Sequence, residues 1–137
     1  MWSEIYWSIM FNECVICHGP PNNNVDQNPN NPRGGDIPGG ASPAALEALD
    51  LTGPDATDTS NWPSDSYPAV VDALAYQVTS CPDEGTIVIP FDPQDSVMIQ
   101  KLRNTQACGT DMPPLDPISE TLIQIVEEWV NLGAPNN

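Results

Sequence analysis

Three residues near the start of the chain have the types and the spacing to hold a metal cofactor. Cys14, Cys17 and His18 form the pattern Cys-x-x-Cys-His, which is typical of covalent attachment of a c-type haem. Two thiols on one helical turn can each add to a haem vinyl group, and the adjacent imidazole then lies under the iron as a ligand. The motif therefore predicts one covalently bound haem c, attached through Cys14 and Cys17 and ligated by His18.

Two other chemistries use similar residues. A structural zinc site built on the motif would need a second close pair of ligands, but Cys81 and Cys108 lie far apart and the chain has one histidine. A redox-active cysteine pair is typical of a βαβ context, which the sequence lacks. The sequence favours haem over both alternatives.

The ligand on the other side of the iron must come from a residue other than histidine. Met1 is terminal, and Met10 and Met98 lie in segments expected to be helical, where packing is the default role of methionine. Met112 lies in the irregular stretch GTDMPP, where proline fixes the backbone. We predict Met112 as the sixth ligand; another donor or an open position are the alternatives. A thioether opposite imidazole fills the coordination sphere and raises the reduction potential, which favours an electron carrier over an enzyme.

Two cysteines remain after the haem takes its pair. Because haem attachment of this type implies an exported protein, Cys81 and Cys108 are predicted to form a disulfide rather than two buried thiols. Closing the chain between these positions would stabilise the fold by about 3 kcal/mol. It would also anchor the loop that carries Met112.

The composition limits the partners. The 137 residues fit one domain, residues 1–137, and include 19 acidic and three basic residues, for a formal charge of −16. Such a charge repels nucleic acid and anionic membranes and attracts basic protein surfaces or divalent cations, but it also suits solubility in salty water. No window has ~18 consecutive apolar residues, so we expect no membrane span.

The first residues carry no Lys or Arg and no small-residue cleavage site, so they do not resemble a secretory signal. We expect a mature chain, periplasmic or extracellular, from which the signal has been removed. If Met1 were the translation start, this export would lack its signal.

Apolar spacing predicts a mainly α-helical chain. Trp2, Ile5, Tyr6 and Ile9 predict a helix over residues 2–13 that runs into the motif. Trp7 and Phe11 form a second apolar strip on it. A last helix is predicted with Asp116 as N-cap, Pro117 as its first residue and Gly133 as terminator. Its apolar residues are Leu122, Ile125, Val126, Trp129 and Val130.

The middle of the chain is less regular. Residues 20–41 are rich in Asn, Pro and Gly and predict a long loop after the motif. Ser42 with Pro43, and Ser66 ahead of Pro68, predict the starts of two short helices. Residues 87–90 predict a brief extended segment, and Asp95 or Ser96 would cap a further helix with Met98 and Leu102 inward. In the second short helix we expect Tyr67, Val70, Val71, Leu74 and Val78 to face the core.

An N-terminal helix, a CxxCH motif, a methionine in a loop and a closing helix together resemble the class I-type cytochrome c superfamily. The segments LDLTG, IVIPFDPQDSVMIQKL, CGTDMPP and IVEEWVNLGAP are more closely similar to environmental bacterial cytochrome c domains of the planctomycete type. The resemblance implies thioethers at Cys14 and Cys17 and axial ligands His18 and Met112. It also implies that helices 2–13 and 117–132 cross beside the haem, with Trp129 as a contact between them.

In this family a proline carbonyl after the motif commonly holds the proximal imidazole. Four prolines compete for that role and none is assigned here: Pro20, Pro21, Pro29 and Pro32. Arg33, Trp62 and Arg103 are candidate partners of the haem propionates, although each fits a surface role equally well. Mitochondrial-type carriers are rich in lysine, whereas this chain has one, so their partners do not transfer to it.

Three hypotheses for function follow. The first is an electron-transfer protein that passes single electrons between redox partner proteins. The second is a structural or conduit subunit of an assembly in which haems stack. The third is a haem enzyme or gas sensor, which requires that Met112 leaves the sixth position open.

Overall fold

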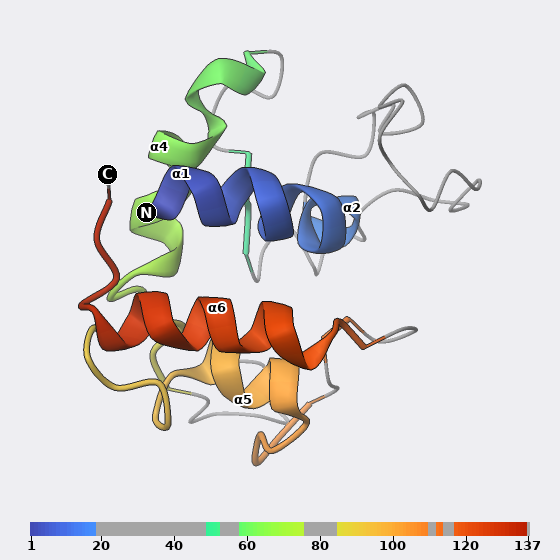
Figure 1. The fold of residues 1–137 in the computed structure, drawn as a ribbon, viewed down its shortest axis with the longest axis vertical. Coiled ribbons are helices and arrows are strands. Elements are labelled where there is room, and N and C mark those ends of the chain that lie inside the picture. Colours follow the sequence, from blue (N-terminus) through green and yellow to red (C-terminus); the bar gives the residue numbers. More distant parts are fainter. Residues whose placement is uncertain (19–48, 53–57, 76–84, 110–111, 114–116, 137) are drawn as a thin grey trace.

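The structure is a computed structural model that describes residues 1–18, 49–52, 58–75, 85–109, 112–113 and 117–136. These residues are mainly helical, as predicted (Figure 1). Extended pairing among them is limited to isolated bridges, which join Val71 to Val88, Leu74 to Thr86 and Ile89 to Asp92. None of the described helices is long and apolar enough to cross a membrane.

The chain begins with one continuous helical stretch. It consists of α1 (Trp2–Ile5), the π-helix η1 (Tyr6–Cys14) and α2 (Val15–His18), which follow one another without a break in Figure 1. The predicted helix leading into the motif is confirmed. Its predicted core face is confirmed as well, because Trp2, Ile5, Tyr6 and Ile9 are all buried.

The second apolar strip of this stretch, formed by Trp7 and Phe11, is only partly buried. Trp7 is 40% exposed, and its ring lies 5.2 Å from that of the partly buried Phe11.

Single π turns are often found where a helix serves a functional site. Here the wider winding ends at Cys14, where the cysteine motif begins.

The last helix, α6 (Glu120–Asn131), begins later than predicted. Its N-cap is Ser119, whose hydroxyl accepts a hydrogen bond from the Leu122 amide. Pro117 therefore precedes the helix, and Asp116 lies outside the described residues. Ile118 is buried, which explains why the chain enters the core before it turns into the helix. Gly133 follows at φ +89°, and a Cβ there would collide with the Phe91 ring, so its predicted role as terminator is confirmed.

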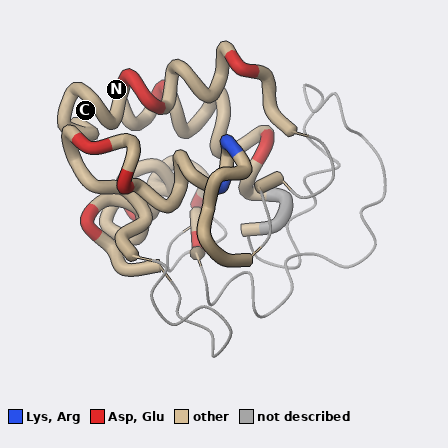
Figure 2. Tube along the Cα trace, turned by 90° about the horizontal axis from the view of Figure 1, so that it is seen from below, with Lys and Arg blue, Asp and Glu red and all other residues tan. Residues whose placement is uncertain are grey.

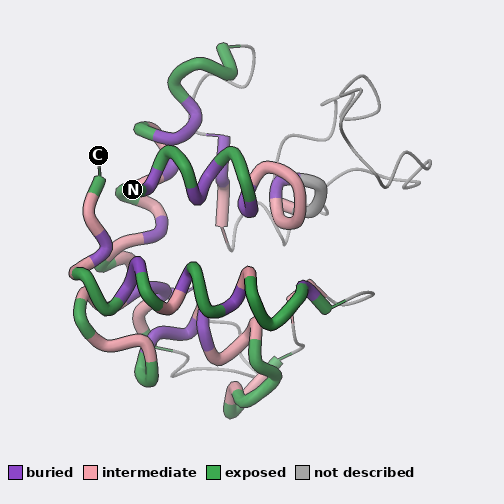
Figure 3. Tube along the Cα trace, in the orientation of Figure 1, coloured by how far each residue is buried: buried purple, intermediate pink, exposed green. Residues whose placement is uncertain are grey.

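Helix α6 buries part of its apolar side chains. Ile123, Val126, Trp129 and Val130 are buried, and Figure 3 shows the buried positions of α6 interrupted by exposed ones. Ile125, one of the apolar residues that marked this helix in the sequence, is 45% exposed.

The two ends of the chain meet at a pair of tryptophans. Trp2 at the start of α1 stacks on Trp129 of α6, with ring centroids 5.0 Å apart. The backbone N–H of Trp2 (3.3 Å) and the indole N–H of Trp129 (3.0 Å) both donate to the carbonyl of Pro135. The predicted contact of Trp129 with the first helix is confirmed, and it places both termini side by side in Figure 1.

The helix predicted from Ser66 is present but shifted. The short 3₁₀ turn η3 (Thr59–Asn61) leads into α4 (Trp62–Val70), so Ser66 is a buried residue inside the helix rather than its cap. The helix ends because Val71 adopts extended dihedral angles and pairs with Val88. Leu74 therefore does not continue the apolar face and is 72% exposed. Val78 lies outside the described residues.

The segment after residue 85 contains isolated bridges where a brief extended segment was predicted, and then the predicted short helix. Val88 and Ile89 each form a bridge, and α5 (Val97–Arg103) follows with Ser96 at its N-cap position. The Ser96 hydroxyl does not cap the helix; it accepts from the Ile89 amide and donates to the Asp92 carbonyl. Met98 and Leu102 pack against the core as predicted. Helix α5 lies against α6, as Figure 1 shows.

Candidate haem site

The CxxCH motif lies at the end of the N-terminal helical stretch. Cys14 is the last residue of η1, and Cys17 and His18 belong to α2. Cys14 is half-buried and packs against the hydrophobic core; the side chain of Cys17 is outside the described set. Because the winding is helical through the motif, Cys14 and His18 lie about one turn apart on the same side of the stretch.

The imidazole of His18 is oriented by a backbone carbonyl. Its Nδ1 atom lies 3.0 Å from the carbonyl oxygen of Leu49. Since a carbonyl can only accept a hydrogen bond, Nδ1 must carry the proton, which leaves the ring lone pair on Nε2. Metal-binding histidines characteristically use their second nitrogen in this way, because the bond fixes the tautomer and the ring orientation. The acceptor is therefore Leu49, whereas the four prolines considered from the sequence lie outside the described residues.

The segment that supplies this carbonyl is itself held against the helix. The Leu51 amide donates to the His18 carbonyl at 2.9 Å, and the Tyr6 hydroxyl donates to the Leu51 carbonyl at 2.6 Å. Between them, the Asp50 carboxylate accepts from both the amide and the hydroxyl of Thr52 at 2.8 Å. Three hydrogen bonds thus join residues 49–51 to the helical stretch, two at His18 and one at Tyr6.

Tyr6 lies in a fully buried environment. Burial raises the pKa of its phenol well above the usual value, and the negative charges of Asp50 and Cys14, when ionised, act in the same direction. The phenol therefore stays protonated and remains a hydrogen-bond donor. Helical spacing predicted Tyr6 as part of an apolar face but did not connect it with His18, because a bond to a backbone carbonyl has no side-chain signature. The LDLTG segment, noted for its resemblance, was the one available signal.

Met112 is half-buried in the segment that follows α5. Its amide donates to the carbonyl of Lys101 at 3.1 Å, and the Lys101 ammonium donates to the carbonyl of Cys108 at 3.0 Å. Lys101 thus bonds to both Cys108 and Met112, through its side chain and its backbone respectively. The other methionines match their predicted places: Met10 is buried in the core, Met98 packs against it, and Met1 is exposed.

Cys108 is disulfide-bonded, and it lies four positions before Met112. The predicted partner, Cys81, falls outside the described residues, so the pairing itself stays a prediction.

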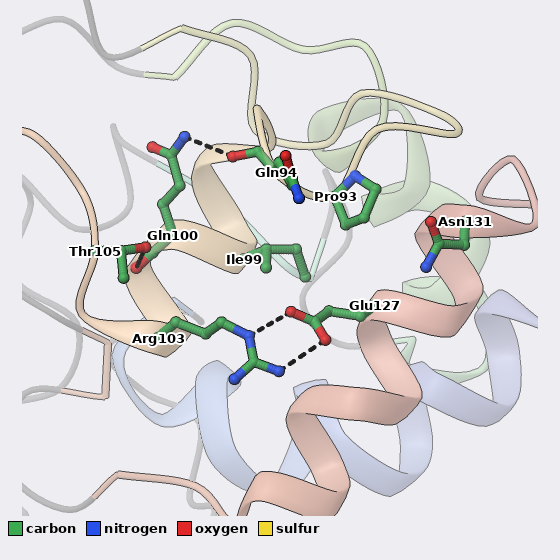
Figure 4. A pocket seen from close by; sticks show the side chains of 8 residues that line it. All are labelled: Pro93, Gln94, Ile99, Gln100, Arg103, Thr105, Glu127 and Asn131. Atoms are coloured by element: carbon green, nitrogen blue, oxygen red, sulfur yellow. Dashed lines mark hydrogen bonds and ion pairs between the residues drawn. The ribbon is translucent and has the colours of Figure 1, made fainter.

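The three candidate propionate partners have different surroundings. Arg103 forms ion pairs with Glu127 and Glu120 of α6. The hydrogen bonds that its guanidinium donates to Glu127 and then to Glu120 raise its pKa. In Figure 4 its guanidinium points at Glu127 from the edge of a surface pocket between α5 and α6. These pairs give no support to a propionate role for Arg103. Trp62 is buried near Phe11, and Arg33 is outside the described part of the chain.

Comparisons with protein-family models, with curated proteins and with solved structures find no match to this chain. Among the described residues, no three His, Cys, Asp or Glu side chains gather into a metal-binding group. The site therefore has to be interpreted from its own geometry.

Proposed function

We propose that this chain is an electron-transfer protein with one covalently bound haem c. The observation that carries the proposal is the hydrogen bond from His18 Nδ1 to the Leu49 carbonyl. It gives the histidine of a CxxCH motif the tautomer that presents Nε2 as a ligand. In a CxxCH motif, this tautomer leaves the lone pair on the ring nitrogen that would bind the haem iron.

The donor set of this chain fits haem c. Cys14 and Cys17 would form the thioether bonds, and His18 would be the proximal ligand. Such a group supplies reversible one-electron chemistry at iron, with no atom or proton transferred. The residues of the chain would hold the imidazole, through the Leu49 carbonyl, and would supply a thioether ligand from Met112.

Met112 is the proposed distal ligand. Of the four methionines, Met10 belongs to the core, Met98 packs against it, and Met1 is exposed at the chain end. Met112 is half-buried in an irregular segment whose two ends are held by Lys101. A ligand fixed in this way would keep the coordination closed in both oxidation states, which suits outer-sphere electron transfer.

Under this proposal the helical fold is a class I-type cytochrome c fold. The contact between Trp2 and Trp129 is the junction of first and last helices that such a fold requires. Covalent haem attachment places the protein in the periplasm or outside the cell. Its charge of −16 favours redox partner proteins with basic docking surfaces.

Absorption spectra of the oxidised and reduced protein test the ligands. The wild type should be low-spin in both states and should show the methionine–iron charge-transfer band when oxidised. Met112→Ala should lose that band, become high-spin and bind carbon monoxide when reduced. The control Met98→Ala removes the same side chain from the core edge and should keep the wild-type spectrum.

A high-spin wild type that binds carbon monoxide or cyanide would overturn the proposal in favour of a haem enzyme or gas sensor. A band that survives in Met112→Ala would overturn the ligand assignment.

A further inference from the structure

Tyr6 is a buried residue whose hydroxyl bonds to the backbone of residues 49–51, the segment that supplies the Leu49 carbonyl to His18. It lies in η1, two turns before Cys14, and its hydroxyl reaches the Leu51 carbonyl at 2.6 Å. The same residue, Leu51, donates its amide to the His18 carbonyl at 2.9 Å. Both backbone polar groups of Leu51 are therefore hydrogen-bonded, the carbonyl to Tyr6 and the amide to His18.

This arrangement determines where the Leu49 carbonyl can lie. Leu49 is two residues before Leu51, and its carbonyl accepts from His18 Nδ1 at 3.0 Å. Without the Tyr6 bond, the Leu51 carbonyl would be a buried acceptor without that donor, and relieving the cost would require the segment to move. Movement of Leu51 would lengthen the bond between Leu49 and His18.

We propose that Tyr6 is a positioning residue that holds the Leu49 carbonyl on His18 through Leu51, and thereby lowers the reduction potential of a haem bound at His18. The inference rests on the proposed function, because it needs iron at Nε2.

The sign follows from the chemistry of the imidazole. A hydrogen bond from Nδ1 to a carbonyl raises the basicity of the ligating nitrogen. A more basic ligand stabilises ferric iron more than ferrous iron, so it lowers the potential. Loss of the Tyr6 hydroxyl should weaken the Leu49 bond and raise the potential.

The structure offers a closely matched control. Tyr67 also donates its hydroxyl to a backbone carbonyl, that of Ala134, at 2.7 Å. Both tyrosines pack edge-on against Trp2, with ring centroids 5.9 Å away for Tyr6 and 6.1 Å for Tyr67. Among the described residues, the Tyr67 hydroxyl bonds to Ala134 and not to residues 49–51, so Tyr67→Phe removes an equivalent hydrogen bond away from His18.

The experiment is spectroelectrochemical titration of the haem-loaded wild type, Tyr6→Phe and Tyr67→Phe. At a fixed electrode potential, Tyr6→Phe should increase the ratio of reduced to oxidised protein about threefold, or about 30 mV for one electron. Tyr67→Phe should leave the ratio unchanged. Equal potentials in all three proteins, or equal shifts in both variants, would overturn the inference.

Site-specific 3-fluorotyrosine at position 6 or position 67 covers the case in which Tyr6→Phe does not fold. The fluorinated phenol keeps the ring and is a stronger donor, so at position 6 the potential should fall, and at position 67 it should not change. A rise or no change at position 6 would contradict the role of Tyr6. Failure of the wild type to bind haem would instead refute the proposed function, so the two failures are distinguishable.

Discussion

The orientation of His18, the proposed haem ligand, depends on residues outside the CxxCH motif. Its tautomer is set by the Leu49 carbonyl, and the position of that carbonyl depends on Leu51 and Tyr6. The cysteines and the histidine could be named from the sequence because the motif has a fixed spacing. Leu49 and Leu51 could not, because they act through main-chain groups that every residue has.

The ion pairs of Arg103 with Glu120 and Glu127 predict how stability depends on pH. Its hydrogen bond holds the pKa of Glu120 below the usual carboxyl value of 4.5, with a smaller effect from Gln124. A carboxylate with a lowered pKa stabilises the folded state above its usual pKa, and this stabilisation disappears as the pH falls through the lowered value.

We therefore expect Arg103→Gln to lower the melting temperature at neutral pH, by at most about 3 °C because the pair is exposed. The difference from the wild type should vanish in acid, where Glu120 is protonated, and should decrease in high salt. Thermal melts followed by circular dichroism measure it, with Glu128→Gln on the same helix as the control. A difference that persists in acid would show that Arg103 acts through packing of its side-chain stem.

The sequence predicted which segments are helical more accurately than it predicted the residues at which each helix begins and ends. The stretch into the motif and the closing helix both have strong apolar periodicity, and both are present. We predicted Asp116 as the N-cap of α6, but the cap is Ser119, and the residue before it, Ile118, is buried. The end of α4 depends on pairing between Val71 and Val88, a long-range contact that helical spacing cannot reveal.

The tryptophan contact between the first and last helices should be a main source of stability. Trp129 is buried, stacks on Trp2 and donates to Pro135. We expect Trp129→Ala to lower the free energy of unfolding by about 3–5 kcal/mol, the usual cost of removing a large core side chain.

Ile125→Ala is the control on the same helix, because Ile125 is 45% exposed. It should cost less than about 1 kcal/mol. Urea unfolding of the haem-loaded proteins measures both values. A larger loss in Ile125→Ala than in Trp129→Ala would mean that another face of α6 packs on the protein.

For the whole molecule, charge is the dominant surface property. Figure 2 shows acidic residues on most of the described elements, whereas the described Lys and Arg residues, Lys101 and Arg103, lie together on α5. Net charge was readable from composition. The placement of the charges was not, because it depends on how the helices are arranged.

The charge predicts a strong effect of salt on electron exchange. With a lysine-rich redox protein as partner, the second-order rate constant should fall at least tenfold between about 0.01 M and 0.15 M salt, as the Debye length shrinks from about 30 to about 8 Å. Stopped-flow mixing measures it, with an uncharged small-molecule reductant as the control. Equal salt dependence for both reductants would argue against docking through the acidic surface.

The most direct test of the account is the intact mass of the denatured chain after expression in a host that matures c-type cytochromes. We predict the mass of the polypeptide plus one haem, retained after extraction with acidified organic solvent, with the added mass located on the peptide that contains Cys14, Cys17 and His18. A chain with the mass of the polypeptide alone, or a haem that is removed by the extraction, would contradict the central claim.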